Sequence, residues 1–487
     1  MSKKEKTSTA GWITAKKERI SYYIGDNAKT LEGNLVQLFM MTFLLLSGVN
    51  LVAIATVTLV VRIFDAVNDV AFGFIIDKLK PAQVKILAKL GGQGRYLPWF
   101  RMTFWLFPLA TVLLFFMPQG ASDWVKVAYF AVFYVIYDIA YTLVDVPMQS
   151  AVMTITGNPA ERNAIVTNRM IITVVVALIS VPLMNFMISE YIGMSIRNVV
   201  LIMSIVFVSM MLPLVFVTKE HNAGEKVDEE EKYTFKDMIL NVKNNKYLLM
   251  MLLSTLTFLS FASGTSITLF ASFYFYNDST ILLIPMLVII IPTIVAQKIA
   301  EKLCIRFEKY KVCIVAQAAH LAIRILLYAL GYRFLILHIV IFSAMSIPSI
   351  MYSMSVQYLM LDCIEYGRFK SGGKECAGII FALQSLILKA AAGISGSLGL
   401  FALSFFGWIT VQAESFADLA EQNITQPESA LNGLWFVYTG FLVIGAGLSL
   451  LCVLFYRLKS SDAKLMAKVN SGEMSREEAL AQMSRTY

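Results

Sequence analysis

The stretch RIFDAVNDVAFGFIIDK, residues 62–78, places charged side chains inside an apolar segment of helical length. Arg62, Asp65 and Asp69 are separated by three and four residues, so on a helix they share one face. A charge at the bilayer centre costs about 2.5–3.5 kcal/mol, and such residues usually face a bundle interior, pair with one another, or mark an ion or substrate path. The stretch therefore predicts a membrane helix with a polar face that has a role.

The rest of the chain has the composition of a membrane protein. Of its 487 residues, 57% are hydrophobic and 15% are charged, whereas soluble domains have about 25% charged residues. Apolar spans of about 20 residues, the length that crosses a bilayer, recur twelve times, near 20–47, 51–77, 99–118, 125–156, 162–189, 198–217, 247–275, 280–301, 312–331, 334–361, 377–407 and 432–456. We therefore predict an all-α membrane protein with twelve transmembrane helices.

The basic residues alternate between loops. They concentrate in the N-terminal tail, after the second span, in the segment 218–246, after the eighth span and in the C-terminal tail, whereas residues 406–436 have no Lys or Arg. The positive-inside rule then places both termini in the cytoplasm, and we expect the cytoplasmic (inner) membrane of a prokaryote. The net charge of +8 is a topology signal facing anionic lipid, so no nucleic-acid partner is expected.

The polar segment 218–246 divides the spans into two sets of six. The predicted parts are a cytoplasmic tail (1–19), a six-helix bundle (20–217), a cytoplasmic middle loop (218–246), a second six-helix bundle (247–457) and a cytoplasmic tail (458–487). Two six-helix bundles form the layout of a secondary transporter with the major facilitator fold. Nucleotide-binding and hydrolase motifs are absent from the sequence, so we expect no enzyme, and no obligate protein partner is evident. In the last tail, Ser475 and Glu478 fit a capping box and predict a short helix.

Two carboxylates, Asp65 and Asp69, lie one turn apart on the opening stretch. In a medium of low dielectric they repel, so one stays protonated unless a cation joins them. Such a pair suits a proton or Na⁺, with Arg62 as a supporting ion pair to Asp65. The alternative is a salt-bridge cluster between helices that only fixes packing, and both interpretations stay open here.

The segment YDIAYTLVDVPMQS, residues 137–150, has a second polar face, formed at spacings of three and four by Asp138, Tyr141, Thr142, Asp145 and Gln149. Pro147 frees the carbonyl of Leu143 four residues earlier. Thr142 and Asp145 could be further oxygen ligands for a cation, or Asp145 could accept hydrogen bonds from a hydroxylated substrate. The alternatives are that Thr142 bonds to its own helix and that Tyr141 is an aromatic packing residue.

In the second half, the stretch DCIEYGRFKSGGK, residues 362–374, is predicted to be a cytoplasmic loop. The following helix has Gln384, Ser385 and Lys389 in the segment ALQSLILK. Lys389 lies about twelve residues past the start of its span. An unpaired ammonium is unfavourable at that depth, so we expect a counter-ion from Asp65, Asp69 or Asp145.

Together these segments resemble the glycoside–pentoside–hexuronide:cation symporter family, which includes the melibiose carrier. The resemblance runs over most of the chain, from SYYIGD to LILK, and its most specific parts are RIFDAVND, GGQGRYLPWF, YTLVDVPMQS with ERNAIVTNR, and DCIEYGRFKSGGK with ALQSLILK. The family takes up a sugar together with Na⁺, H⁺ or Li⁺. The resemblance therefore implies a sugar, a monovalent cation and the lipid bilayer as partners, and no cofactor other than the coupling cation.

The resemblance also implies roles for particular residues. The cation-binding positions are Asp65, Asp69, Thr142 and Asp145, with Na⁺ at Asp65 and Asp69 as the one possible metal. The expected substrate-binding residues are Asp26, Asn27, Lys29, Tyr141, Asp145, Gln149, Arg169, Gln384, Ser385 and Lys389. The ion pairs that close a cytoplasmic gate are expected from Arg95, Asp362, Glu365, Arg368 and Lys374.

This chain departs from the family pattern at the sugar site. Gln149 stands where the melibiose carrier has a tryptophan that stacks on the sugar, and Asn27, with Asp26 beside it, stands where that carrier has an aspartate. In the loop before residue 377, Ala377 stands where relatives often have glutamate. A site that loses an acid but keeps Lys29 and Arg169 is more positive, which favours an anionic sugar such as a hexuronide. An uncharged oligosaccharide or a pentoside stays open.

The sequence thus predicts cation-coupled symport of a glycoside, pentoside or hexuronide by alternating access. Two alternatives come from other classes of protein. One is a lipid or lysolipid transporter with the same fold, and the other is a membrane sensor that does not transport and uses its intramembrane charges for packing.

Overall fold

The computed structural model describes residues 12–78, 89, 94–221, 243, 245–371 and 377–485. These residues form helices joined by turns, and they contain no strand beyond an isolated β-bridge between Ser47 and Gln412. The chain packs as two units: unit 1 is Met1–Asn50, Ile63–Glu230 and Thr410–Asn423, and unit 2 is Leu51–Arg62, Glu231–Ile409 and Ile424–Tyr487.

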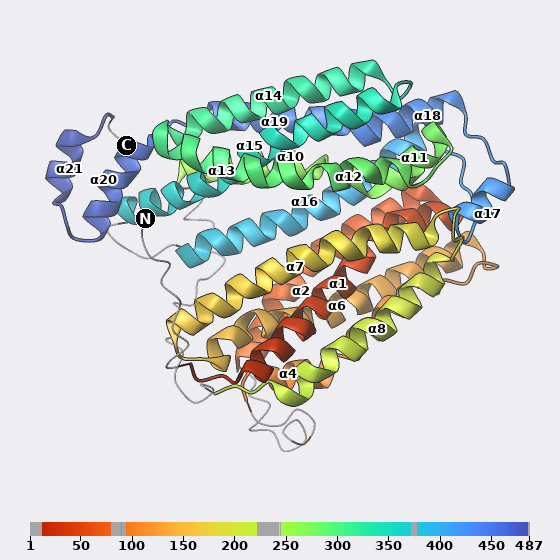
Figure 1. Ribbon diagram of the computed structural model, residues 1–487, viewed down its shortest axis with the longest axis horizontal. Coiled ribbons are helices and arrows are strands. Elements are labelled where there is room, and N and C mark those ends of the chain that lie inside the picture. Colours follow the sequence, from red (N-terminus) through yellow and green to blue (C-terminus); the bar gives the residue numbers. More distant parts are fainter. Residues whose placement is uncertain are drawn as a thin grey trace. The chain divides into compact units, whose positions relative to one another are not determined.

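Unit 1 is built from long apolar helices. They are α1 (Lys16–Leu46), most of α2 (Leu51–Lys78), α4 (Leu97–Thr103), α5 (Leu106–Phe115), α6 (Asp123–Ile155), α7 (Pro159–Ile188) and α8 (Ile196–Val217), with the short α17 (Phe416–Glu421). Helix α1 packs against α8 and α7, and α5 packs against α6 and α8. Figure 1 shows α1, α6, α7 and α8 of unit 1 running in roughly the same direction.

Helices α1 and α8 approach each other closely because a glycine lies at their crossing. A Cβ atom added at Gly25 would lie 2.5 Å from Cβ of Leu214 on α8. Small residues at helix crossings in membrane proteins let the backbones come together, so that van der Waals packing can hold the helices. Gly25 therefore fixes how α1, which holds several of the predicted site residues, is placed in unit 1.

Helix α6 stays continuous through Pro147. The proline removes one backbone donor, and the carbonyl of Leu143, four residues earlier, accepts a hydrogen bond from the hydroxyl of Thr103 at 3.4 Å. A neighbouring helix therefore satisfies the carbonyl that the sequence predicts to be freed, as is required inside a bilayer.

Unit 2 contains a second set of helices: α10 (Lys246–Ser260), α11 (Thr268–Tyr276), α12 (Ile284–Val288), α13 (Ile290–Arg306), α14 (Lys309–Leu330), α15 (Leu335–Lys370), α16 (Ala377–Phe405), α18 (Glu428–Trp435), α19 (Phe441–Leu454), α20 (Ser460–Asn470) and α21 (Arg476–Gln482), with short 3₁₀ turns at Ser263–Ile267 and Ile281–Leu283 and a π-helical turn at Phe436–Gly440. Helix α15 packs against α13 and α14, and α10 packs against α16 and α19. The core residues between them include Met251, Leu359 and Ile380.

The predicted cytoplasmic loop that begins at Asp362 is wrong in its first part, because α15 continues to Lys370. Lys309 donates to the Asp362 carboxylate at 2.6 Å, and Asn470 of α20 donates to Glu365 at 2.7 Å. The apolar pattern marks where the bilayer ends and not where a helix ends. A helix whose polar groups find partners outside the bilayer continues past that point.

The short helix predicted in the C-terminal tail is confirmed as α21. The Ser475 hydroxyl accepts from the backbone of Glu478 at 3.2 Å, and the Glu478 carboxylate accepts from the backbone of Ser475 at 3.1 Å, which forms the capping box. Helix α21 packs on α20, which in turn packs on α15 of unit 2.

Eight helices of the described ranges are long and apolar enough to cross a membrane, or nine if α4 and α5, which bend by 40°, are one span. The all-helical architecture is confirmed. The count of twelve spans and the side on which the termini lie stay predictions. Residues 222–242 of the predicted middle loop lie outside the described residues.

Candidate functional site

A cavity of about 720 Å³ lies in unit 1, lined by residues of α1, α6 and α7. Its size is within the range of small-molecule sites in proteins, about 300–1,000 Å³. Five charged residues line it, namely Asp26, Lys29, Asp145, Arg162 and Arg169. Four of these are predicted site residues, so unit 1 brings together side chains that are as much as 143 positions apart in the sequence (26 to 169).

The shortest ion pair of the cavity joins α1 to α6. The Lys29 ammonium lies 2.6 Å from Oδ1 of Asp145 and 3.4 Å from Oδ1 of Asp26, one helical turn earlier on α1. The Lys29 and Asp26 side chains are almost fully buried, with 6% and 3% of their surface exposed. Gln149 donates to the other oxygen of Asp145 at 2.7 Å. Every oxygen of Asp145 therefore has a donor.

The guanidinium of Arg169 lies on the α7 side of the same cavity. Its Nε atom is 3.6 Å from Oδ2 of Asp26. Of the described residues, three basic and two acidic side chains line the cavity, so their summed charge is positive by one. An anionic group entering the cavity would meet an uncompensated positive charge.

The structure distinguishes between Asp26 and its neighbour Asn27, which the sequence could not. Asn27 donates to the carbonyl of Tyr23 at 2.7 Å, and its amide oxygen accepts from Thr173 of α7 at 2.6 Å. Asn27 thus joins α1 to α7, whereas Asp26 lines the cavity.

Tyr141 and Thr142 lie on α6 but are not among the residues that line the cavity. Tyr141 packs on Phe107, with 5.4 Å between ring centroids, and lies against Gly33. Tyr141 thus makes the aromatic contact that one alternative expects, and Thr142 is buried. Their roles at the substrate and cation sites stay predictions. Asp138 of the same face lies 3.5 Å from the amide nitrogen of Asn68, which links α6 to α2.

The α2 residues are placed only in part. Asp65 is buried in unit 1, and the side chain of Arg62, in unit 2, lies against Gly393 of α16. The side chain of Asp69 lies outside the described residues, so its pairing with Asp65 as a cation site stays a prediction. Among the residues that were described, no group of three His, Cys, Asp or Glu side chains could hold a metal ion.

The remaining predicted residues lie in unit 2 or at helix ends. Gln384 lies on α16, 3.5 Å from Gln357 of α15, while Ser385 is exposed and Lys389 is half-buried. Among the predicted gate residues, Asp362 and Glu365 contact groups of unit 2, and Arg368 lies in the last turn of α15. The backbone amide of Arg95 donates to the Glu220 carboxylate at 2.6 Å. Lys374 lies outside the described residues. The gate and the roles of these residues stay predictions.

Arg162 is a cavity residue that the sequence reasoning did not single out. Its terminal Nη2 atom donates to the carbonyl of Thr156 at 3.4 Å, and its Nε atom is buried with no hydrogen-bond partner in the described part of the chain. Arg162 and Arg169 are seven residues apart on α7, so they lie on the same face of the helix. That spacing was the signal by which Arg162 could have been found.

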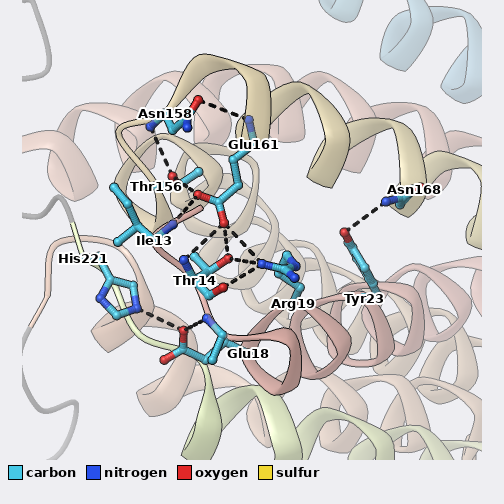
Figure 2. Close-up of polar contacts among 11 residues, drawn as sticks. Ile13, Thr14, Glu18, Arg19, Tyr23, Thr156, Asn158, Glu161, Asn168 and His221 are labelled. Carbon is cyan, nitrogen blue, oxygen red and sulfur yellow. Dashed lines mark hydrogen bonds and ion pairs between the residues drawn. The ribbon is translucent and has the colours of Figure 1, made fainter. Parts of the chain in front are cut away.

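A second polar cluster, shown in Figure 2, holds one end of unit 1 together. The buried carboxylate of Glu161, in the first turn of α7, accepts from the backbone of Ile13 at 3.0 Å, the backbone of Thr14 at 3.1 Å and the hydroxyl of Thr156 at 2.6 Å. Arg19 adds an ion pair at 3.4 Å. The segment before α1 is thereby fixed to the start of α7.

Comparison with known proteins identifies the family. Residues 21–460 match the family model described as MFS/sugar transport protein. The chain belongs to this family. The resemblance seen in the sequence motifs is thus confirmed, and the protein is a multi-pass membrane transporter and not an enzyme.

Named relatives match over most of their length. The chain is 24% identical to the isoprimeverose transporter of Lactiplantibacillus pentosus over 495 residues, covering 95% of this chain and 93% of the relative. It is 24% identical over 410 residues to the glucuronide carrier protein homolog of Escherichia coli (strain K12), covering 81% and 85%. Among solved structures, a bacterial homolog of the human lysosomal transporter Spinster matches with a TM-score of 0.62 at 13% identity, covering 90% and 96%. This last likeness shows the fold alone.

Proposed function

We propose that this transporter moves a sugar across the cytoplasmic membrane of a prokaryote, coupled to the inward movement of a cation. The observation that supports this most is the cavity of unit 1, in which Asp26, Lys29, Asp145 and Arg169 surround a space of ligand size. The bacterial relatives named above as carriers of isoprimeverose and glucuronide add support.

The polar groups of the cavity suit a sugar. A sugar hydroxyl both donates and accepts hydrogen bonds, as the hydroxyls of Ser and Thr do. Asp26 and Asp145 accept, while Lys29, Gln149 and Arg169 donate. Hydrogen bonds to ionised groups are roughly twice as strong as neutral ones, so a sugar placed between these groups would be held and oriented by them.

The excess positive charge of the cavity favours an anionic sugar, a hexuronide, over a neutral glycoside. Arg162, whose Nε atom has no hydrogen-bond partner among the described residues, adds to the positive charge that Arg169 supplies. A pentoside such as isoprimeverose is the second candidate because the relative that carries that name covers nearly the whole chain.

The transport cycle in this proposal uses twelve spans, cytoplasmic termini and alternating access of the cavity. A cation at Asp65 and Asp69 neutralises their repulsion. Each monovalent cation that enters down 100 mV with an uncharged sugar supplies about 2.3 kcal/mol, roughly a fifty-fold accumulation of that sugar. With a hexuronide anion the two charges cancel, and the concentration gradient of the cation drives accumulation. The proposed cation is Na⁺ or H⁺.

Uptake into proteoliposomes tests the proposal. Purified protein is reconstituted and offered isoprimeverose, a glucuronide, an uncharged glycoside and a lysolipid under an inward Na⁺ gradient, an inward proton gradient, or neither. Accumulation of one of the sugars above its external concentration, abolished by collapsing the gradient, is expected. Transport of the lysolipid alone would support the lipid-transporter alternative, and transport of nothing would support the sensor.

A further inference from the structure

Lys29 lies deep inside unit 1 with its charge held by two acids. It follows Lys16, the first residue of α1, by 13 positions (29 − 16), which corresponds to about 20 Å of helix rise. Its side chain is only 6% exposed, so its ammonium needs partners within the protein. Asp145 at 2.6 Å and Asp26 at 3.4 Å supply them.

The charges around Asp145 are already balanced without a mobile cation. Lys29 binds one oxygen of Asp145 and Gln149 donates to the other. Asp26 has Lys29 on one oxygen and Arg169 on the other. A sodium ion at Asp145 would have to displace a donor and would then lie beside an ammonium, and two like charges at such a distance in a low dielectric repel strongly.

We infer that the Lys29 ammonium acts as a tethered cation. It occupies the position beside Asp145 that the sequence analysis assigned to the coupling cation. Asp145 then belongs to a permanent ion pair with α1 and is not a ligand of the mobile cation. The meaning of this inference for coupling rests on the proposed function, whereas the binding of cations to the purified protein can be measured without any sugar.

Removing the ammonium leaves the Asp145 carboxylate, whose side chain is 14% exposed, with no opposite charge at 2.6 Å. A carboxylate that is largely removed from water and has lost its close counter-ion is unfavourable, so the cavity would recruit a monovalent cation in place of Lys29. Lys29→Gln keeps a long polar side chain but removes the charge. It is expected to create a cation site that the natural chain does not have.

The test measures thermal unfolding of the full-length protein in detergent while NaCl or LiCl replaces choline chloride at constant ionic strength. A ligand that binds the native state raises the melting temperature with its concentration. Lys29→Gln should gain a saturable stabilisation by Na⁺ or Li⁺, or by protons when the pH is lowered at fixed salt. The cation concentration that gives half of this stabilisation should be about tenfold below that of any wild-type response, a difference of about 1.4 kcal/mol. The double variant Lys29→Gln/Asp145→Asn should lose this gain, and Lys29→Arg should respond as wild type does.

A second variant keeps the inference open to contradiction even if Lys29→Gln fails to fold. Asp145→Asn alone leaves Lys29 paired with Asp26 and should keep the wild-type cation response. Loss of the response in Asp145→Asn, absence of a new response in Lys29→Gln, or its persistence in the double variant would overturn the inference. A wild-type protein that accumulates no sugar would contradict the proposed function but would leave these titrations interpretable.

Discussion

Arg169 of α7 lies against Asp26 of α1, with 3.6 Å between Nε of the arginine and Oδ2 of the aspartate. The two residues are far apart in the sequence, and their contact joins two helices that line the same cavity. The guanidinium has further donors in a planar arrangement that can bind a ligand oxygen while one nitrogen faces Asp26. This relationship makes Arg169 the residue whose replacement should affect substrate binding most.

Arg169→Ala should abolish sugar binding and uptake, because it removes the guanidinium that lies beside Asp26 in the cavity and leaves Asp26 with one fewer counter-ion. Arg169→Lys keeps the charge but loses the planar fork, and partial uptake is expected. Uptake by proteoliposomes and equilibrium binding to the purified variants are the measurements. Wild-type affinity in Arg169→Ala would remove Arg169 from the site.

Arg162→Gln should weaken binding of a glucuronide more than binding of an uncharged glycoside. A hydrogen bond to a charged group contributes about 1.5–3 kcal/mol, so the glucuronide should lose about tenfold or more in affinity. Arg197→Gln is the matched control, because Arg197 donates to the carbonyl of Met117 and does not line the cavity. Equal losses for both sugars would argue that Arg162 does not select for the anion.

Glu161→Ala should loosen the segment that precedes α1. The change leaves the backbone donors of Ile13 and Thr14 and the hydroxyl of Thr156 without their acceptor, and each buried unsatisfied group costs about 1–3 kcal/mol. A lower melting temperature and faster proteolysis of the N-terminal segment are expected. The exposed Glu421 of α17 provides the control variant Glu421→Ala. Equal melting temperatures and proteolysis rates of the two variants would show that the polar cluster around Glu161 in Figure 2 does not hold the segment before α1.

Gly25→Ala should destabilise unit 1, because the added Cβ would lie 2.5 Å from Leu214 of α8. Overpacking of a close contact costs about 1–3 kcal/mol. Gly447→Ala on α19 is the control, since a Cβ added there meets nothing within 4 Å and alanine favours a helix. The melting temperature should fall for the first variant and hold or rise for the second. A reversed order would mean that α1 and α8 do not pack as described.

Much of the local structure follows from the sequence because it depends on neighbouring residues. The capping box of α21 and the carbonyl freed by Pro147 are set by spacings of three and four residues, and the structure has both. Asp145 and Gln149 are one turn apart and contact each other, as their shared helix face predicts.

The partners across helices could not be predicted, because no local pattern encodes them. The contact of Lys29 with Asp145 depends on how α1 packs against α6, and the role of Asn27 depends on where Thr173 of α7 lies. Glu161 looks like an ordinary first-turn acid until the backbone of Ile13 is found beside it. Helix α15 extends past its apolar part because Lys309 and Asn470 are within reach of its end.

Protection of a single cysteine by sugar tests most directly whether the cavity of unit 1 is the sugar site. Met170 lines the cavity, and Thr167, one turn earlier on α7, is exposed and does not. Each is changed to cysteine in a transport-active background whose five native cysteines are replaced by alanine. The rate of maleimide labelling is then measured with and without the sugar that the proteoliposomes accumulate. The account predicts that the sugar slows labelling at Met170→Cys and leaves Thr167→Cys unchanged. Labelling at Met170→Cys that is equally fast with saturating sugar would contradict it.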